Sequence, residues 1–188
     1  MSKVEVHPLT AERWADFERL FGPRGAYGGC WCMFWRLRSS VNAKSKSIDN
    51  KRAMKSIVDS DEPPGLLAYV DGEPVGWCSI DQREKAARIE RSRTLKRVDD
   101  HPGVWSLNCF VIAKNRRRLG LMTTLLDASI EHARRRGAKI VEAYPIEPSG
   151  DLKGYDGYTG IASSFRRRGF REVARPRPDQ PIMRLELG

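Results

Sequence analysis

The segment that most constrains the fold runs from residue 104 to residue 145, where two strand patterns enclose an amphipathic helix. Residues 104–112 are apolar and rich in β-formers, a glycine turn follows, and residues 139–144 resemble a second strand. The helix between them places small or apolar side chains on one face, namely Met122, Leu125, Leu126, Ser129 and Ala133. A strand, a helix and a strand within about 40 residues form a right-handed crossover, so we expect a parallel or nearly parallel strand pair.

Helices and strands are also predicted on either side of this unit. Asp71-Gly72 separates two apolar, β-rich runs and is a strong hairpin signal. Residues 81–100 are highly charged with few apolar side chains, which leaves open an exposed helix or a mobile loop. The other predicted elements are a short strand at 4–6, helices at 11–21, 48–58 and 161–168, and strands at 65–70, 73–80, 171–173 and 182–187.

The length and hydropathy of the chain predict one cytoplasmic domain. Its 188 residues are enough for one core and few for two. No run approaches the roughly 18 to 20 consecutive apolar residues of a membrane span, and the amino terminus lacks the apolar run of a signal peptide. We therefore expect no membrane association.

The four cysteines form no Cys-x-x-Cys pair, and a chain of this size needs no disulfide for stability. We expect free thiols at Cys30, Cys32, Cys78 and Cys109. Cys30-Trp31-Cys32 offers two metal ligands, but no nearby histidine completes a zinc-like set, so we predict no metal site.

The net charge of +10 favours an anionic partner such as nucleic acid, a membrane surface or a polyphosphate cofactor. The basic residues form short clusters at 116–118, 134–136 and 166–168. We interpret the second and third clusters as solvated helix faces. Because the clusters are scattered and no known binding module is present, we predict no specific binding of nucleic acid.

The turn before the central helix carries the most specific motif, Arg117-Arg118-Leu119-Gly120-Leu121-Met122. It resembles the Gln/Arg-x-x-Gly-x-Gly/Ala loop of the GNAT superfamily of N-acetyltransferases, although Met122 stands where a small residue is usual. The resemblance implies an α+β fold with a mixed, mostly antiparallel sheet of about six to seven strands, flanked by helices and splayed at one parallel pair around acetyl-coenzyme A. It also implies a single domain over 1–188, with a cofactor core at about 104–175 and an acceptor-side region at about 22–62.

A glycine turn of this kind suits a pyrophosphate for physical reasons. The start of a helix offers unpaired N–H groups and the positive end of the helix dipole. Gly120 lets the backbone approach the phosphates, and the neighbouring arginines add charge, whereas the Met122 side chain is expected to face the core. With the strand backbone that the resemblance adds, the predicted cofactor contacts are Phe110, Val111, Ile112, Arg117, Arg118, Leu119, Gly120, Leu121 and Met122.

Residues 162–170 resemble the carboxy-terminal signature of the family, in which a helix bearing a tyrosine ends at Gly-Phe. In many family members that tyrosine returns a proton to the coenzyme A thiolate, but Phe165 stands in its place and has no proton to give. Tyr155 and Tyr158 precede the helix, and we predict Tyr158 as the substitute acid. The alternatives are that the tyrosines only cap a glycine-rich loop, or that the thiolate leaves without an acid.

Direct transfer to an amine also requires a base, because the amine must lose a proton. Glu142, inside an apolar strand, is the predicted base, ahead of Glu147 and Asp156. A buried carboxylate is costly unless paired, so an equal alternative is that Glu142 faces solvent or pairs with an arginine. His101 lies in a loop and is expected to be exposed rather than catalytic.

Two further features bear on the acceptor side and on the thioester. Cys109 could lie near the thioester and form an acyl-cysteine, although a buried structural thiol is the commoner case. The aromatic run at 31–35 lies where the family forms its acceptor wall, and it either shapes a pocket or belongs to the core. The spacing of Trp31 and Trp35 fits a buried helical face.

Two functions follow from these predictions. The leading one is an N-acetyltransferase that transfers the acetyl group of acetyl-coenzyme A to a primary amine by direct attack in a ternary complex. The alternative is a non-catalytic protein that binds coenzyme A or acyl-coenzyme A on the same fold and has a regulatory role. The acceptor is expected to be a small-molecule or peptide amine, and its identity and the formation of a homodimer stay open.

Overall fold

The fold is built on one mixed sheet, seen in a computed structural model that describes residues 3–95, 97–148 and 157–188. Seven strands lie in the order β1-β2-β3-β4-β5-β7-β6. β4 and β5 run parallel, and the other neighbouring strands are antiparallel, which confirms the predicted sheet. The strands are β1 (Val4–Pro8), β2 (Gly65–Val70), β3 (Glu73–Gln82), β4 (Val104–Ile112), β5 (Ile140–Ala143), β6 (Arg171–Arg177) and β7 (Gln180–Glu186).

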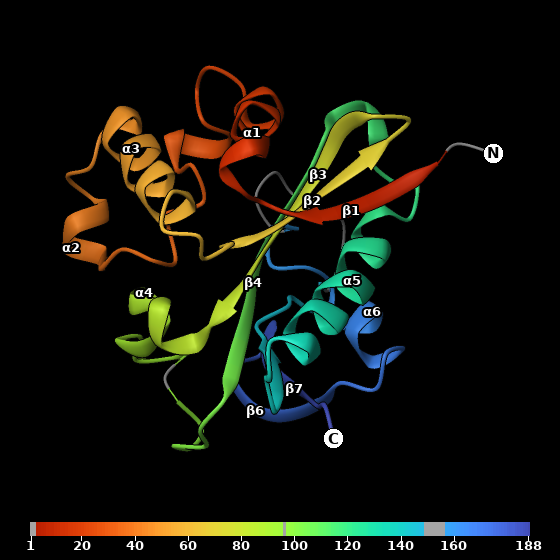
Figure 1. The fold of residues 1–188 in the computed structure, drawn as a ribbon. Helices are drawn as coiled ribbons and strands as arrows, with labels where there is room; N and C mark the ends of the chain where they lie inside the picture. Colours follow the sequence, from red (N-terminus) through yellow and green to blue (C-terminus); the bar gives the residue numbers. More distant parts are fainter. Residues whose placement is uncertain (1–2, 96, 149–156) are drawn as a thin grey trace.

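Helices cover both faces of the sheet (Figure 1). α1 and α3 pack on one face, and α5 and α6 pack on the other. The α-helices are α1 (Trp14–Phe21), α2 (Ser39–Asn42), α3 (Ser47–Val58), α4 (Ala87–Glu90), α5 (Leu121–Arg135) and α6 (Ala162–Arg166). The 3-10 turns are η1 (Ala11–Arg13), η2 (Tyr27–Gly29), η3 (Arg83–Lys85) and η4 (Lys114–Arg116).

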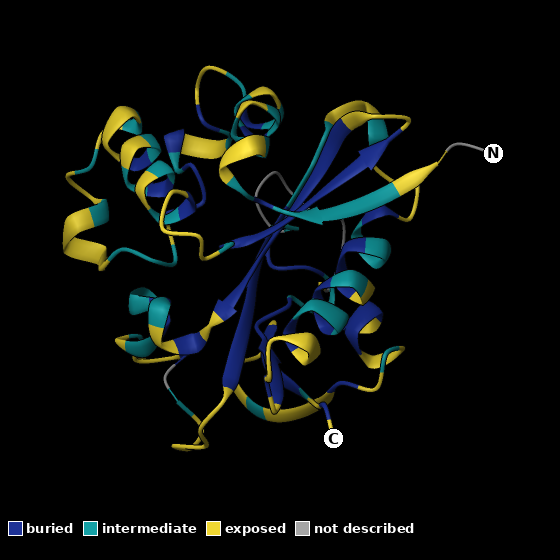
Figure 2. Ribbon diagram, in the orientation of Figure 1, coloured by how far each residue is buried: buried dark blue, intermediate teal, exposed yellow. Residues whose placement is uncertain are grey.

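The central strands are buried along most of their length because both faces are covered (Figure 2). Neighbouring residues of β3 show this directly. Trp77 packs toward α1, with its ring centroid 4.9 Å from that of Phe17, whereas Cys78 packs in the cluster beneath α5. Strands of this kind carry continuous apolar runs rather than an alternating pattern.

The local predictions are mostly confirmed. The hairpin joins β2 to β3, and Asp71 and Gly72 have φ of 50° and 82°, the left-handed backbone that a tight two-residue turn requires. The helix predicted at 48–58 is α3, and the central helix is α5. The helix predicted at 11–21 begins as a 3-10 turn, and α6 is shorter than predicted, whereas β6 is longer.

Residues 81–100 take neither of the two expected forms, since they contain two short helical turns and a buried arginine. The Arg83 guanidinium lies 3.4 Å from the Glu142 carboxylate on β5. Arg184 on β7 contacts the same carboxylate at 2.7 Å and pairs with Asp99. These ion pairs tie the charged segment to the sheet, a role that the sequence pattern did not indicate.

The aromatic run after η2 is not helical, so the predicted helical face of Trp31 and Trp35 is wrong. Trp31 and Cys32 have φ of 45° and 60°, in the left-handed region that helices exclude. The Trp31 indole lies on the backbone of Gly25, where a Cβ would come within 2.2 Å of the indole nitrogen. Packing of this ring against a glycine therefore decides the local backbone.

Candidate active site

The parallel strands β4 and β5 diverge in the middle of the sheet. Their pairing runs from Val104 opposite Ile140 to Leu107 opposite Ala143, and β4 then continues alone to Ile112. At the same point the register of β4 against β3 shifts, which leaves Asn108 without a partner. This bulge and the end of the β5 pairing open one edge of β4.

A segment from further along the chain lies at this edge. The main-chain N–H of Phe110 donates to the carbonyl oxygen of Tyr158 at 2.6 Å. Beyond β5, the N–H of Ile146 donates to Gly160 and its carbonyl accepts from Ala162, both at 2.9 Å. Residues 158–161 therefore bridge the diverging strands, and we call them the bridging segment.

The glycine turn lies just after β4 and starts α5. Gly120 has φ of 78°, and an added Cβ would meet no atom within 4 Å, so its conformation rather than crowding selects glycine. Arg117, Arg118 and Leu119 are exposed beside it. Met122 packs against the core beneath α5, which confirms the expected direction of its side chain.

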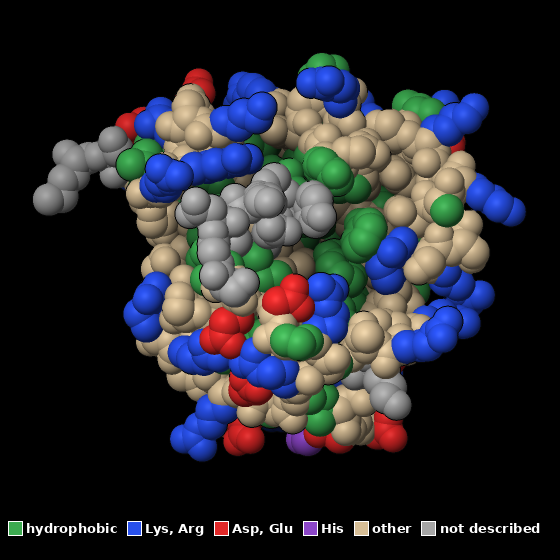
Figure 3. Space-filling view, turned by 180° about the vertical axis from the view of Figure 1, so that it is seen from behind, with side chains coloured by type: hydrophobic (Ala, Val, Ile, Leu, Met, Phe, Trp, Pro, Cys, Tyr) green, Lys and Arg blue, Asp and Glu red, His purple; other side chains and the backbone are tan. Residues whose placement is uncertain are grey.

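A cavity of about 620 Å³ opens against β4 on the side of α3. It contacts Cys109 and Val111 of β4, Tyr158 and Thr159 of the bridging segment, and Asn50 of α3. Figure 3 shows the side of the molecule opposite to the view of Figure 1, where hydrophobic side chains gather near the centre among Lys and Arg. The other residues lining the cavity are Ala26, Tyr27, Gly28, Cys30, Cys32, Phe34, Trp35, Asn42, Ser45, Ile146, Arg177, Asp179 and Gln180.

The sequence model of the GNAT acetyltransferases matches residues 31–149, more than half of the chain. The chain belongs to the GNAT acetyltransferase family. It is therefore an acyltransferase, and acetyl-coenzyme A is the co-substrate of the family. No curated protein is similar enough in sequence to match the chain.

Solved structures of acetyltransferases share the fold of this GNAT protein. YncA of Salmonella typhimurium, solved with acetyl-coenzyme A, has 15% identity and a TM-score of 0.57 over 98% of this chain and 94% of that one. An N-acetyltransferase of Staphylococcus aureus Mu50 has 10% identity and a TM-score of 0.58 over 100% of both chains. The PaiA N-acetyltransferase of Thermoplasma acidophilum, solved with coenzyme A, has 11% identity and a TM-score of 0.55, with 98% and 99% covered.

The predicted acid of the GNAT site, Tyr158, lines the cavity and is half-buried. Burial raises the pKa of its phenol, so the hydroxyl keeps its proton at neutral pH. Phe165 is fully buried, with its ring against Phe110 and Phe170, and has a packing role only. Tyr155, the other tyrosine considered, lies outside the described residues.

The predicted base, Glu142, is not among the residues that line the cavity. Its carboxylate is buried, contacts Arg83 and Arg184, and accepts a hydrogen bond from the Tyr144 hydroxyl at 2.5 Å. This is the arginine pairing that was the alternative interpretation of its position. The contacts account for a carboxylate inside an apolar strand without a catalytic role.

The remaining candidates for proton transfer also lie apart from the cavity or outside the described residues. Glu147 is partly exposed, and hydrogen bonds from Arg166 and Arg175 lower its pKa to about 2. Asp156 lies outside the described residues. His101 is exposed, as expected, and its ring is 2.6 Å from the carbonyl of Pro102.

Asn50 is a cavity residue that the sequence analysis missed. It is buried, its Nδ2 donates to the carbonyl of Gly29 at 3.0 Å, and its Oδ1 has no hydrogen-bond partner among the described residues. Asn50 shares the buried face of α3 with Met54 and Val58. A polar residue at a core-facing position of an amphipathic helix was the signal that could have found it.

No helix in the described part of the chain combines the length and apolarity needed to cross a bilayer. Among the same residues, no three His, Cys, Asp or Glu side chains gather as a metal site would require.

Proposed function

We propose that this acetyltransferase transfers the acetyl group of acetyl-coenzyme A to a primary amine bound in the cavity, by direct attack in a ternary complex. The observation that carries the proposal is the position of the cavity. It contacts β4 at Cys109 and Val111, directly beyond the bulge at Asn108. An amine in the cavity would face a thioester laid along the open edge of β4.

The cofactor side of the proposal rests on the turn and on that strand edge. The first N–H groups of α5, together with the exposed Arg117 and Arg118, suit the pyrophosphate of coenzyme A. The pantetheine would lie against the backbone of Phe110, Val111 and Ile112. Leu119, Gly120, Leu121 and Met122 complete the proposed contacts through the backbone of the turn.

The acceptor side of the proposal rests on the walls of the cavity. Aromatic rings from the acceptor-side region form much of the wall, and the free Oδ1 of Asn50 offers a hydrogen-bond acceptor inside it. An amine is a hydrogen-bond donor and suits such a group. A buried acceptor left without a donor costs about 1 to 3 kcal/mol, so binding a donor there is favourable.

For the proton that the coenzyme A thiolate needs, we propose Tyr158 as the donor. Its ring lines the cavity and its raised pKa keeps the phenol protonated. Glu142 stays a prediction for the base, and its ion pairs favour a structural role instead.

A panel of primary amines incubated with acetyl-coenzyme A tests this function, with each acetylated product detected by mass spectrometry. We expect one class of amine to be acetylated, and Asn50→Leu to raise its KM while leaving coenzyme A affinity unchanged. Asn42→Leu, which alters a partly exposed residue at the same cavity, is the control. Coenzyme A binding without acetylation of any amine would contradict the proposal.

The same experiment separates the second function, a coenzyme A sensor without catalysis. The bridging segment favours the sensor. The Tyr158 carbonyl accepts the hydrogen bond of the Phe110 N–H, the group that the pantetheine would use. A sensor would bind coenzyme A and move this segment but release no acetylated amine.

A further inference from the structure

Two of the four cysteines, Cys32 and Cys109, meet at the wall of the cavity. Cys32 reaches this place from the loop after η2 and Cys109 from β4, one residue beyond the bulged Asn108. The backbone of Cys32 and of the preceding Trp31 is left-handed, which is costly for residues with side chains. The surrounding structure therefore holds Cys32 in a backbone conformation that this residue does not favour by itself, and this fixes the position of its sulfur.

Hydrogen-bond donors converge on the Cys32 sulfur. The indole N–H of Trp77 donates to it at 3.1 Å. Hydrogen bonding with the side chains of Cys109 and Ser79 also lowers the pKa of Cys32, and the Arg36 guanidinium adds positive charge nearby. Arg36 is itself paired with Asp81 at 2.9 Å, so its charge is partly compensated. Together these groups favour a thiolate at Cys32 over a neutral thiol.

Cys32 and Cys109 shift each other's pKa in opposite directions. The hydrogen bond from Cys109 is the main cause that lowers the pKa of Cys32, against the opposing effect of burial. The same hydrogen bond is the main cause that raises the pKa of Cys109 well above its usual range. These opposite directions favour the proton on Cys109 and the negative charge on Cys32.

Other titratable groups near Cys32 and Cys109 are less suited to accept a proton, because at neutral pH they already hold one or are paired with an arginine. Burial raises the pKa of Cys30 to about 11, and it raises that of Cys78 further. Burial also raises the pKa of Tyr158. Asp179, which also lines the cavity, forms an ion pair with Arg177 at 3.0 Å.

We propose that Cys32, with Cys109 as its hydrogen-bonding partner, is the base that removes the proton from the acceptor ammonium. An N–H bond of the ammonium breaks and an S–H bond forms at Cys32, directly or through one water, and the freed electron pair attacks the thioester carbonyl. The C–S bond to coenzyme A then breaks, and Tyr158 protonates the leaving thiolate. The attacking nitrogen loses its second proton as the amide forms, and this proton returns to Tyr158 through water. This role of Cys32 rests on the proposed amine acetylation. It provides a base for that reaction, since Glu142 does not line the cavity.

A base fits this sulfur better than a nucleophile does. Cys32 is only 3% exposed and is surrounded by donors, so a thioester carbonyl has little room to reach it. A proton needs less space, because it can cross a single water molecule.

The first test needs no acceptor. The ultraviolet absorbance of the thiolate is followed from about pH 5 to pH 9 in the parent protein and in Cys32→Ser. We expect the difference between the two to titrate with a midpoint well below the ordinary cysteine value of about 8.5, and Trp77→Phe to move that midpoint upward. An ordinary midpoint at Cys32 would overturn the proposal without touching the acetyltransferase function.

The second test uses the best amine of the panel. Cys32→Ser is expected to lower kcat/KM about 100-fold or more at neutral pH and to abolish the acidic limb of its pH profile, with acetyl-coenzyme A affinity unchanged. Trp77→Phe should keep the limb but shift it upward, which a purely structural role would not do. Cys78→Ser, on the other face of the sheet, is the control.

Two outcomes contradict the base. If the pH profile of Cys32→Ser follows that of the parent enzyme, Cys32 is not the base. Transfer of an acetyl group to Cys32 when the protein is incubated with acetyl-coenzyme A alone would replace the base with a nucleophile. Thermal unfolding of each variant confirms that the folded protein is being compared.

Discussion

The main-chain N–H of Phe110 donates a hydrogen bond of 2.6 Å to the carbonyl oxygen of Tyr158. Beyond its last pairing with β5, β4 is therefore hydrogen-bonded to Tyr158, which lies 48 positions after Phe110 in the chain. The same strand edge is where the pantetheine of the co-substrate is proposed to lie. Binding of the co-substrate and the bond to Tyr158 therefore compete for one N–H group.

This competition predicts that acetyl-coenzyme A displaces the bridging segment. Hydrogen exchange measured with and without coenzyme A should increase at residues 158–161, because loss of the bond from Phe110 to the Tyr158 carbonyl releases the segment from β4. Exchange at residues 109–112 should decrease at the same time. Unchanged exchange in both segments at saturating coenzyme A would mean that the cofactor binds elsewhere.

Gly120→Ala should weaken the binding of coenzyme A more than it affects folding. A left-handed alanine costs about 1 to 2 kcal/mol, and its methyl group would stand where the pyrophosphate approaches the turn. Gly137→Ala, after the other end of α5, is a matched control, because Gly137 also has positive φ, 81°, with open space around it. Calorimetric titration should show a lower affinity for Gly120→Ala alone, while thermal unfolding shifts both variants similarly.

Tyr158→Phe should lower kcat about 10- to 100-fold with little change in KM for the amine, because the variant keeps the ring and loses the proton donor. Tyr27→Phe, at the same cavity with its ring centroid 6.1 Å from that of Tyr158, serves for comparison. Steady-state kinetics with the best amine decides the matter. An equal loss in both variants would assign the effect to the shape of the cavity.

Glu142→Gln should destabilise the fold and leave catalysis by the folded enzyme largely intact. Removing the charge leaves Arg83 and Arg184 without their buried partner, and breaking such a pair costs about 3 to 5 kcal/mol. Chemical denaturation measures this loss, with the exposed Glu186→Gln on β7 as the reference. If kcat instead falls 100-fold at a temperature where the variant is folded, Glu142 is the base after all.

The pair between Asp99 and Arg184 should make stability depend on acid pH. The hydrogen bond from Arg184 lowers the pKa of Asp99 to about 2, below the value of about 3.9 in an unfolded chain. The stabilisation is therefore complete above the unfolded value and is lost as the pH falls through the folded one. Asp99→Asn should flatten this part of the unfolding profile, whereas Asp100→Asn, at a side chain that is 94% exposed, should not.

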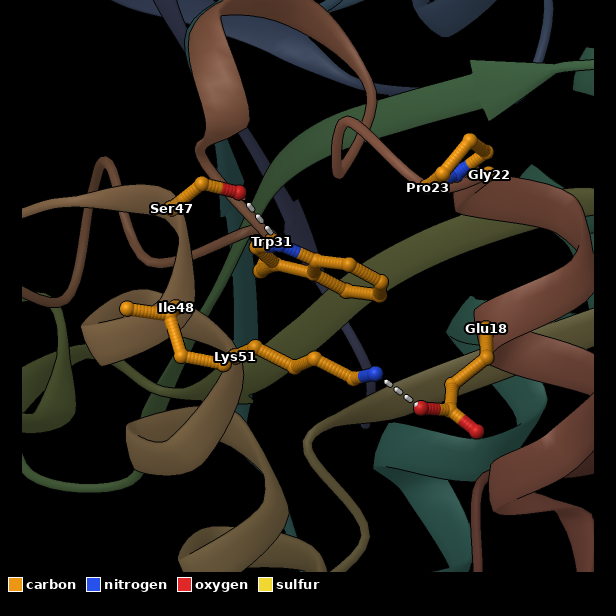
Figure 4. A pocket seen from close by; sticks show the side chains of 7 residues that line it. All are labelled: Glu18, Gly22, Pro23, Trp31, Ser47, Ile48 and Lys51. Atoms are coloured by element: carbon orange, nitrogen blue, oxygen red, sulfur yellow. Dashed lines mark hydrogen bonds and ion pairs between the residues drawn. The ribbon is translucent and has the colours of Figure 1, made fainter.

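A second pocket of the molecule shows how the loop that carries Trp31 is held in place (Figure 4). It lies between α1 and α3 around Trp31, whose indole N–H donates to Ser47 at 2.9 Å. Lys51 lies over the same ring, 5.2 Å from its centroid, and pairs with Glu18. These polar groups bind one another around the indole. We therefore infer that this pocket has a structural role, which is to fix Trp31 and, through it, the neighbouring Cys32.

The sequence by itself determined the features that depend on near neighbours in the chain. The strand, glycine turn and helix around Gly120 and the hairpin at Asp71-Gly72 follow from periodicity and from backbones that only a few residue types adopt. The family was indicated by the resemblance of the motif around Gly120. Phe165, at the position of the usual tyrosine, likewise indicated from the sequence that the usual acid is missing.

Only the tertiary structure decided which distant side chains meet. Glu142 could pair, face solvent or act as a base, and the choice depended on Arg83 and Arg184, which lie 59 and 42 positions away in the chain. The meeting of Cys32 with Trp77 and Cys109, and of Tyr158 with Phe110, is equally invisible in a linear pattern. Charge and hydrogen bonding act through space, so the groups that set the chemistry of a buried site are known only once the chain is folded.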